Sequence, residues 1–215
     1  MIVAGIDEAG RGPVIGPMMM AICAIDEKEL GKLEALGVKD SKLLTPQKRE
    51  FLFDKIKALC KHNIIRLSPS QIDDALNDRS VNLNRLEAKT TAVLIKGLRA
   101  DKFIIDCPSN NLQAYKDLMV HLVNNPDKNL VVEHKADLNN IIVGAASILA
   151  KVTRDREIEQ LKKVAGIDFG SGYPSDPLTV AFLKENWNKF DFFRTSWATY
   201  KNVAGTKKQK SLDSF

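Results

Sequence analysis

The chain has 215 residues, 44% of them hydrophobic, which suffices for one compact core and would be cramped for two full domains. Its 32 lysine and arginine residues outnumber 27 acidic ones, and the net charge of +5 suits a partner that carries phosphate groups. Three widely spaced cysteines without a CxxC pair, no secretion signal and no apolar stretch of membrane-spanning length indicate a soluble protein of the reducing cytoplasm.

The predicted elements alternate between strands and helices. Short apolar runs bounded by turn-forming residues indicate strands, and apolar residues three or four apart indicate helices. Thr45 followed by Pro46 is typical of a helix start. In chain order we expect strands at 2–6 and 18–25, a helix from 46 to about 62, a strand at 63–67, a helix at 84–98, a strand at 102–106, a helix to about 122, a strand at 130–133, a helix at 139–163 and a helix from about 178.

This order of elements predicts an α/β fold, and such sheets carry their chemistry just beyond the strand ends. We expect one main domain over residues 1–176 and a small helical extension over 177–200. The last residues, 201–215, are basic and contain few apolar groups, which predicts a flexible tail.

Carboxylates follow three of the predicted strands. Asp7 and Glu8 close the first strand, Asp106 closes a central one, and Asp137 lies shortly after a later one. If these groups converge, two like charges about 5 Å apart repel by roughly 3 kcal/mol at an effective dielectric of about 20. Divalent cations would offset this repulsion, and carboxylate oxygens select Mg²⁺ or Mn²⁺. Two such ions could clamp a phosphodiester for hydrolysis.

Each carboxylate also has an ordinary structural explanation. Asp137 could cap the long helix, and Asp106 could form a turn. Asp7 and Glu8 are neighbours, and neighbours on a regular strand face opposite sides of the sheet. Both can reach one site only if the strand loses its regularity there, which the following alanine and glycine would allow.

Several sequence blocks resemble one family. The run GIDEAGRGPVIGPM at 5–18 is followed, in the order of that family, by DSK, FIID, HKAD, AASILAKVTRD and GYPSD. Over most of residues 5–176 the chain is thereby similar to type 2 ribonuclease H, ribonuclease HII. The resemblance implies a ribonuclease H-like catalytic domain, which is a mixed sheet flanked by helices, with the helical extension packed on it.

The resemblance also implies an activity. Asp7, Glu8, Asp106 and Asp137 match the metal-binding and catalytic carboxylates of the family. The implied reaction is hydrolysis with two Mg²⁺ or Mn²⁺ ions, which leaves 5′-phosphate and 3′-hydroxyl ends. The implied substrates are the RNA strand of RNA–DNA hybrids and single ribonucleotides in duplex DNA, so the enzyme would act in primer removal or ribonucleotide repair.

Two further elements of the family would recognise the sugar. Its Gly-Arg-Gly element matches Gly10, Arg11 and Gly12, where a backbone without side chains can approach a ribose 2′-hydroxyl. Its tyrosine matches Tyr173, whose ring would pack on the sugar that follows the ribonucleotide. An ordinary turn and a loop aromatic that covers the core are the structural alternatives.

Three residues are candidate phosphate contacts. Ser147 and Lys151 are four residues apart and share one face of the predicted helix, and Lys42 lies in the DSK block. Solvated lysines are the competing interpretation. His134 is not a candidate site residue, because a lone histidine near a strand end is usually structural.

The last seven residues read Q-x-x-L-x-x-F, with Gln209, Leu212 and Phe215 at the defined positions. This pattern resembles the peptide with which replication and repair enzymes bind the ring-shaped sliding clamp, PCNA. Leu212 and Phe215 would enter an apolar pocket from one face of a helical turn, and Gln209 would bond beside it. The fullest motif has two terminal aromatics and this one has a single phenylalanine, which would reduce affinity. Such a tail is more similar to the archaeal branch of the family than to the bacterial one.

We therefore expect a monomeric, metal-dependent endoribonuclease. Two alternatives stay open, namely another two-metal nuclease of the same superfamily that cuts DNA, and a non-catalytic module that binds hybrids or the clamp. The glycine loop, formed by Gly10, Arg11 and Gly12, argues against the first alternative. The presence of all four carboxylates argues against the second. Type 3 ribonuclease H carries an extra N-terminal domain and is disfavoured because this chain begins at the catalytic strand.

Overall fold

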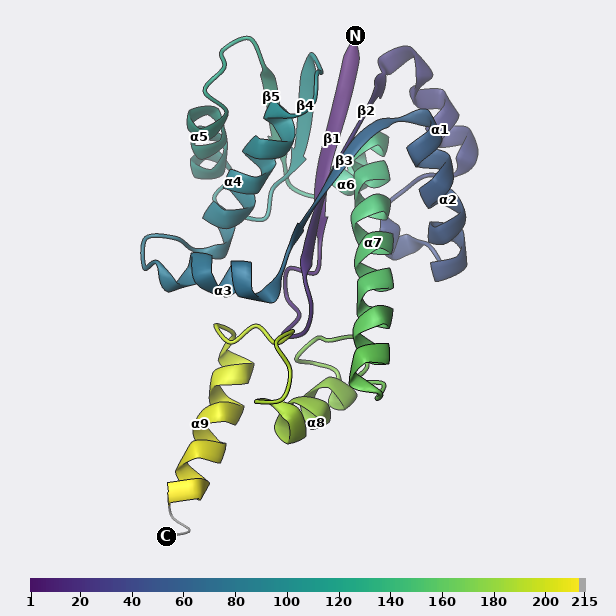
Figure 1. Cartoon of the computed structure of the whole chain (residues 1–215). Coiled ribbons are helices and arrows are strands. Elements are labelled where there is room, and N and C mark those ends of the chain that lie inside the picture. Colours follow the sequence, from purple (N-terminus) through teal and green to yellow (C-terminus); the bar gives the residue numbers. More distant parts are fainter. Residues whose placement is uncertain (213–215) are drawn as a thin grey trace. The chain divides into compact units, whose positions relative to one another are not determined.

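The computed structural model describes the backbone of residues 1–212 and the side chains of residues 1–206 (Figure 1). The chain forms two compact units, each assembled from segments that are distant in the sequence. The predicted division at residue 176 follows different boundaries and stays a proposal. Unit 1 comprises Met1–Ala9, Met19–Arg66 and Leu83–Thr153, and unit 2 comprises Gly10–Met18, Leu67–Asn82 and the described residues from Arg154 onward.

Unit 1 is built on a five-stranded sheet. Its strands are β1 (Ile2–Ala9), β2 (Met18–Asp26), β3 (Lys61–Leu67), β4 (Lys102–Asp106) and β5 (Asn129–Glu133), in the order β3-β2-β1-β4-β5. Strand β1 pairs antiparallel with β2 and parallel with β4, and β4 pairs parallel with β5. All five predicted strands are present, and the mixed sheet confirms the predicted fold class.

Helices cover both faces of this sheet. They are α1 (Leu30–Leu36), α2 (Pro46–Leu59), α4 (Leu83–Lys96), α5 (Leu112–Val123), α6 (Ala136–Asn139) and the first half of α7 (Ile141–Ala165), with 3₁₀ turns at Glu27–Glu29 and Ser41–Leu43. Figure 1 shows α4 and α5 on one side of the sheet and α1, α2 and α7 on the other. Helix α2 begins as predicted, because the Thr45 side chain accepts a hydrogen bond from Lys48 N at 3.2 Å and Pro46 follows the cap.

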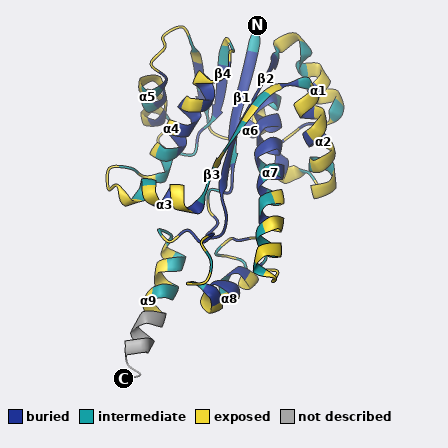
Figure 2. Cartoon of the chain, in the orientation of Figure 1, coloured by how far each residue is buried: buried dark blue, intermediate teal, exposed yellow. Residues whose placement is uncertain are grey.

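Strands β1 and β2 are buried along nearly their whole length (Figure 2). Because helices cover both faces, these strands read as continuous apolar runs and not as an alternating pattern. Gly5 of β1 has a special role, since a Cβ atom at this position would overlap the backbone of Ile142 and Val143. The missing side chain therefore lets the start of α7 lie directly against β1.

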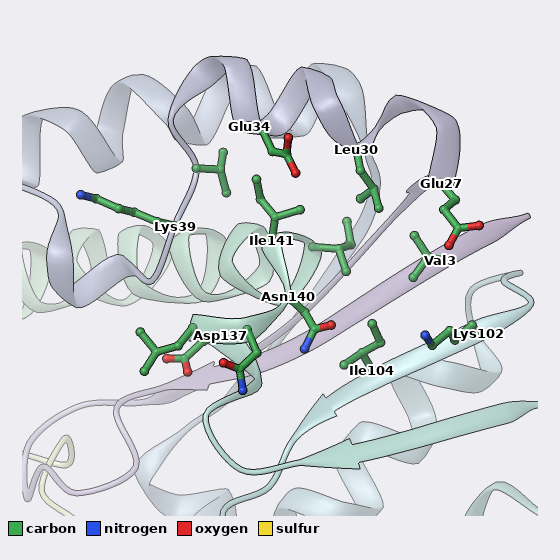
Figure 3. A pocket seen from close by; sticks show the side chains of 14 residues that line it. Val3, Glu27, Leu30, Glu34, Lys39, Lys102, Ile104, Asp137, Asn140 and Ile141 are labelled. Atoms are coloured by element: carbon green, nitrogen blue, oxygen red, sulfur yellow. The ribbon is translucent and has the colours of Figure 1, made fainter.

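A cavity of about 400 Å³ lies in unit 1 beside α1 and the junction of α6 with α7 (Figure 3). Ile104 of β4 contributes to its apolar lining, and Glu34, Lys39 and Asn140 contribute polar groups. Of the four predicted carboxylates, only Asp137 lines this cavity. The cavity is therefore not the place where the predicted carboxylates meet.

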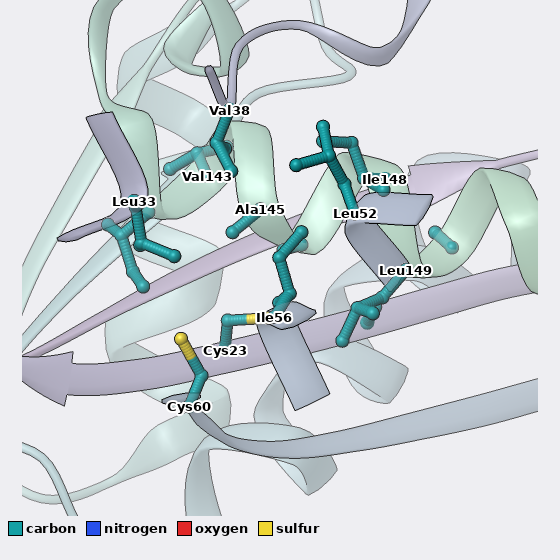
Figure 4. Close-up of a cluster of buried hydrophobic side chains, with 14 of the residues drawn as sticks. Cys23, Leu33, Val38, Leu52, Ile56, Cys60, Val143, Ala145, Ile148 and Leu149 are labelled. Atoms are coloured by element: carbon teal, nitrogen blue, oxygen red, sulfur yellow. The ribbon is translucent and has the colours of Figure 1, made fainter. Parts of the chain in front are cut away.

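The core between β2, α2 and α7 contains two buried cysteines (Figure 4). Cys23 and Cys60 lie among apolar side chains such as Ile56 and Leu149. Burial raises the pKa of the Cys60 thiol to about 12 and also raises the pKa of the Cys23 thiol. Both thiols therefore stay protonated at neutral pH and act as small apolar side chains.

Unit 2 has an apolar core of its own, which is rich in aromatic rings. Its helices are α3 (Pro69–Asn77), the second half of α7, α8 (Pro177–Asn186) and α9 (Ala198–Leu212). The ring of Phe182 lies 5.3 Å from that of Phe169 and 6.2 Å from that of Phe192, measured between centroids. The 10–18 segment is tied to this core, because Val14 N donates to Gly172 O at 2.9 Å.

Four α-helices were not predicted, and the predicted long helix is present. Helices α1, α3 and α9 were missed, although Ser68 and Gln71 form a capping box at the start of α3 and the sequence contains this pattern. The predicted helix at 139–163 is confirmed as α7, and the short helix α6 before it was also missed. Asn140 is extended between the two, and its side chain donates to Glu133 Oε2 at 2.9 Å. Among the described residues, no helix has the length and apolar composition that a bilayer span requires.

Helix α9 runs as far as Leu212, where we predicted a tail from residue 201. Tertiary contacts hold its first turns. The Tyr200 hydroxyl donates to Trp187 O at 3.0 Å, and Val203 packs against the aromatic core of unit 2. The segment contains too few apolar residues to indicate a helix by periodicity, so these contacts were not predictable from the local sequence.

Candidate active site

Three of the four predicted carboxylates come together in unit 1, at the ends of β1 and β4. One carboxylate oxygen from each of Asp7, Glu8 and Asp106 lies within 4.8 Å of the others. Asp7 is buried, with 6% of its surface exposed, and the other two are half-buried. At such spacing, one divalent cation can bind oxygens from several carboxylates.

Asp7 and Glu8 reach this group from a strand that stays regular. The expectation that the strand would become irregular there was wrong, because β1 keeps its antiparallel pairing with β2 as far as Ala9. Its parallel pairing with β4 ends earlier, at Ile6. Beyond that residue β1 does not pair with β4, and carboxylate oxygens of both Asp7 and Glu8 lie within 4.8 Å of one from Asp106.

Asp106 and Asp137 are connected through the turn after β5. Asp106 Oδ1 accepts a hydrogen bond from Ala136 N at 2.7 Å, which is a long-range contact and not a local turn. Asp137 lies in the first turn of α6, and the cap position before it is taken by Lys135 with φ 56°. The Asp137 carboxylate is buried and accepts a hydrogen bond from Lys42 Nζ at 3.2 Å. Asp137 thus lies outside the group of three, and its charge acts on Asp106.

Lys42 is positioned by a 3₁₀ turn that sequence reasoning missed, although the DSK block marks its place. Asp40 Oδ1 accepts a hydrogen bond from Lys42 N at 2.9 Å. Arg49 Nη1 of α2 donates to Ser41 O at 3.0 Å and to Leu44 O at 2.7 Å. The Lys42 side chain is 78% exposed despite its ion pair with the carboxylate, so its ammonium group is also accessible to a phosphate.

Ser147 and Lys151 lie on consecutive turns of α7. The Ser147 hydroxyl is buried, lies 2.9 Å from the Ser41 hydroxyl and hydrogen-bonds to the Asp7 carboxyl. This position favours support of Asp7 over the phosphate contact that we predicted. Lys151 is half-buried, and its phosphate contact stays a prediction.

The electrostatics of the three carboxylates favour a bound cation. Burial and the charge of Glu8 raise the pKa of Asp7 well above its ordinary value, although the hydrogen bond from Ser147 opposes the shift. Burial also raises the pKa of Asp106, against the opposing effect of the Ala136 amide. A divalent cation would offset both the lost hydration and the like-charge repulsion. These residues therefore fit a divalent metal centre.

The residues predicted to sense the sugar belong to unit 2. Gly10 has φ +85°, and a Cβ atom at this position would overlap the Arg154 side chain, so conformation and space both require glycine. Gly12 lies beside Tyr173, since a Cβ atom there would be 3.5 Å from the ring. The Tyr173 ring is 37% exposed and lies 5.5 Å from the Arg154 guanidinium. The glycine loop and the tyrosine are therefore neighbours within unit 2, as their proposed shared role requires.

Sequence reasoning also missed two buried arginines of unit 2. Arg154 and Arg194 are 2% and 0% exposed, and both contact Gly10. Arg154 stands inside the AASILAKVTRD block, so its position carried a signal. Arg194 stands in FFRTSW, where no motif marks it.

The predicted clamp-binding motif lies at the end of α9. Gln209 and Leu212 belong to this helix, and Phe215 lies outside the described residues. The motif therefore stays a prediction.

A mixed five-stranded sheet with acidic residues at the ends of neighbouring parallel strands defines an enzyme of the ribonuclease H-like class. The family model for ribonuclease HII matches residues 4–200. The chain therefore belongs to the ribonuclease HII family, and it is a metal-dependent endoribonuclease of the ribonuclease H type.

Relatives and solved structures agree with this assignment. Ribonuclease HII of Methanococcus maripaludis strain C6 is 46% identical over 94% of this chain and 87% of its own length, and that of Pyrococcus furiosus is 42% identical over 100% and 98%. The crystal structure of ribonuclease H2 from Pyrococcus horikoshii OT3 has 41% identity and a TM-score of 0.88, over 97% of this chain and 99% of that one. The PCNA:RNase HII complex from Archaeoglobus fulgidus has 37% identity and a TM-score of 0.84, over 92% and 95%. These similarities confirm the predicted resemblance to the archaeal branch.

Proposed function

We propose that this protein hydrolyses the RNA strand of RNA–DNA hybrids and incises duplex DNA at single embedded ribonucleotides with the help of two divalent cations. The observation that carries the proposal is the convergence of Asp7, Glu8 and Asp106 within 4.8 Å. Membership of the ribonuclease HII family supports the hybrid as substrate. The proposed products carry 5′-phosphate and 3′-hydroxyl ends.

The four carboxylates would hold the cations, with Asp7, Glu8 and Asp106 as the shared centre and Asp137 as the fourth ligand. Bound Mg²⁺ or Mn²⁺ supplies the Lewis acidity that phosphodiester hydrolysis needs at neutral pH. Neighbouring residues hold three of these carboxylates in place. The Ser147 hydroxyl bonds to Asp7, the Ala136 amide bonds to Asp106, and Lys42 pairs with Asp137.

Selectivity for RNA is proposed to lie in the glycine loop of unit 2 and in Tyr173. Gly10 and Gly12 present backbone without a side chain, so a sugar can approach the peptide groups closely. The exposed ring of Tyr173 beside Gly12 would pack on the sugar after the ribonucleotide. A 2′-hydroxyl on that second sugar would clash, which would favour RNA followed by DNA.

A cleavage assay with three matched duplexes tests the proposal. The duplexes are an RNA–DNA hybrid, a DNA duplex with one ribonucleotide and the same duplex made only of DNA, each incubated with Mg²⁺, with Mn²⁺ or with a chelator. We expect metal-dependent cuts in the first two, with 5′-phosphate ends at the mapped site. Incision of the all-DNA duplex would favour a DNA nuclease, and binding without turnover under every metal condition would favour a non-catalytic module.

We also propose that Gln209, Leu212 and Phe215 bind a sliding clamp. The support is the pattern Q-x-x-L-x-x-F together with the similarity to a ribonuclease HII from Archaeoglobus fulgidus that was solved in complex with PCNA. Leu212→Ala should weaken binding to the clamp and leave cleavage of short free duplexes unchanged. Ser211→Ala, between the motif positions, is the matched control. Equal clamp binding by the Leu212→Ala and wild-type proteins would contradict the proposal.

A further inference from the structure

A buried arginine holds the backbone of the glycine loop in unit 2. Arg194 is fully buried and donates from all three guanidinium nitrogens to backbone carbonyls. Its Nη2 lies 2.6 Å from Gly10 O, its Nη1 lies 3.0 Å from Arg11 O, and its Nε lies 2.9 Å from Gly16 O. One planar group therefore determines the orientation of two successive peptides of the loop and of a third just beyond it.

The direction of these carbonyls determines the direction of two N–H groups. In a trans peptide the C=O and N–H bonds point to opposite sides, and no described peptide bond is cis. Because the carbonyls of Gly10 and Arg11 point toward Arg194, the N–H groups of Arg11 and Gly12 point away from it. Two successive N–H groups that point in a common direction can donate to one oxygen atom.

The charge of Arg194 also strengthens this pair of donors. A hydrogen bond from a charged guanidinium polarises the carbonyl that accepts it, and the N–H of the same peptide becomes a better donor. The effect is largest where water is excluded, and Arg194 is fully buried. The loop thus presents donors, and the atom that it recognises should be an acceptor.

A second layer of contacts holds Arg194 itself. Asp73 of α3 is buried and accepts four hydrogen bonds from Thr195 and Ser196, the two residues that follow Arg194. These are from Thr195 N at 2.7 Å and Oγ1 at 2.8 Å to Asp73 Oδ2, and from Ser196 N at 3.0 Å and Oγ at 2.5 Å to Asp73 Oδ1. The Trp197 ring packs on the guanidinium, with 4.8 Å between its centroid and Arg194 Cζ. Arg194 is therefore held rigidly on both sides.

We propose that Arg194 is a positioning residue for ribose selectivity, which it confers by turning the Arg11 and Gly12 N–H groups outward as a donor pair for the 2′-oxygen of a ribonucleotide. This inference rests on the proposed function. Deoxyribose has no acceptor at C2′, so the donor pair would stay without its ligand when DNA is bound. Loss of the arrangement should therefore affect ribose and deoxyribose duplexes differently.

The test compares Arg194→Lys with Trp197→Phe in the full-length protein. Lysine keeps the charge and loses the fork of donors. Trp197→Phe is the matched control, because it keeps an aromatic ring beside the guanidinium and removes the 3.0 Å hydrogen bond from Nε1 to Gly12 O. The nitrogen of that peptide belongs to Pro13 and has no hydrogen, so this bond orients no N–H group. The probes are a DNA duplex with one ribonucleotide and its all-DNA counterpart, and their affinities are measured by fluorescence anisotropy with Ca²⁺ in place of Mg²⁺.

For Arg194→Lys we expect the ratio of the two affinities to fall by about tenfold, the effect of losing one or two hydrogen bonds. Affinity for the all-DNA duplex and the binding of Mn²⁺ should stay unchanged, and Trp197→Phe should alter the ratio by less than about threefold. An unchanged ratio in Arg194→Lys would overturn the inference. An equal loss of affinity for both duplexes would overturn it as well, because that is the signature of a merely structural role.

A second variant keeps the test decisive if Arg194→Lys does not fold. Asp73→Asn retains the shape of the side chain and weakens the hydrogen bonds to Thr195 and Ser196, so the ratio should fall in the same direction by a smaller factor. A preserved ratio in folded Asp73→Asn would then count against the inference. A wild-type ratio near one would overturn the proposed ribose recognition together with this inference, whereas a wild-type preference that survives both substitutions would overturn the inference alone.

Discussion

The carboxylate group of unit 1 and the glycine loop of unit 2 are positioned by opposite electrostatic arrangements. In unit 1, Asp7, Glu8 and Asp106 bring like charges together, and burial raises the pKa of Asp7 and Asp106. In unit 2, the positively charged guanidinium of Arg194 faces the negative ends of carbonyl dipoles and donates hydrogen bonds to Gly10 O and Arg11 O. We propose that a cation completes the first arrangement, whereas hydrogen bonds within the protein hold the second.

The largest effect is expected when a carboxylate of unit 1 is neutralised. Asp7→Asn or Asp106→Asn should lower Mg²⁺-dependent cleavage by about 1,000-fold, because the charge that holds the cations contributes directly to the transition state. Hybrid binding should remain largely intact. Asp117→Asn, an exposed carboxylate on α5, is the control and should cut normally. Single-turnover cleavage rates measure the effect, and unchanged cleavage by either active-site variant would refute the assignment.

Gly10 tests whether the loop is as rigid as its contacts indicate. Gly10→Ala should destabilise the protein by about 1–3 kcal/mol, because alanine at φ +85° is strained and its methyl group would overlap Arg154. Gly205→Ala is the matched control, since a Cβ atom there meets nothing within 4 Å and alanine favours the helix. Urea unfolding measures both variants. Equal stability of Gly10→Ala and wild type would mean that the loop can rearrange.

Thermal unfolding in the absence of metal tests whether the buried charge of Asp7 destabilises the folded protein. The pKa of Asp7 is raised in the folded protein, so folding favours the protonated carboxyl. The contribution of this protonated carboxyl to the free energy of unfolding is lost as pH rises through the raised pKa. Asparagine has no such loss. At neutral pH, Asp7→Asn should therefore melt about 2–4 °C higher, the shift that 1 kcal/mol produces in a chain of this size.

The same measurement across pH and with metal provides the control. The advantage of Asp7→Asn should shrink as pH falls toward 3.8, the ordinary pKa of an aspartate, because the wild-type carboxyl is then protonated in the folded state. Added Mn²⁺ should stabilise the wild type more than the variant. A pH-independent difference between the two proteins would show that charge is not the cause.

The smallest effect is expected at the turn that carries Lys42. Arg49→Lys keeps the charge but cannot reach both Ser41 O and Leu44 O in the same geometry, so stability should fall by about 0.5–1 kcal/mol. Cleavage should fall only slightly, because Lys42 keeps its ion pair with Asp137. Denaturant unfolding and steady-state kinetics measure the two effects. A large loss of activity without a loss of stability would assign Arg49 to the substrate instead.

Local patterns predicted all five strands, and they predicted the carboxylates that follow three of them. They did not predict the contacts that position these groups. Lys42 and Asp137 are 95 residues apart, and Arg194 and Gly10 are 184 residues apart, so no periodicity or short motif connects the members of either pair. Helical spacing correctly placed Ser147 and Lys151 on one face of a helix. It could not predict that the Ser41 and Asp7 side chains lie beside Ser147, because these residues are distant in the sequence.

By itself, the sequence determined the family, the α/β class and the acidic residues that we propose to serve the chemistry, because these are properties of short segments and of residue type. Only the tertiary structure decided how the segments meet. It showed that a regular β1 delivers both Asp7 and Glu8 to one group, and that Arg194 turns the peptides of the glycine loop. The physical reason is that hydrogen bonds and carboxylate clusters depend on distance and direction in space, and those are set only when segments far apart in the chain pack together.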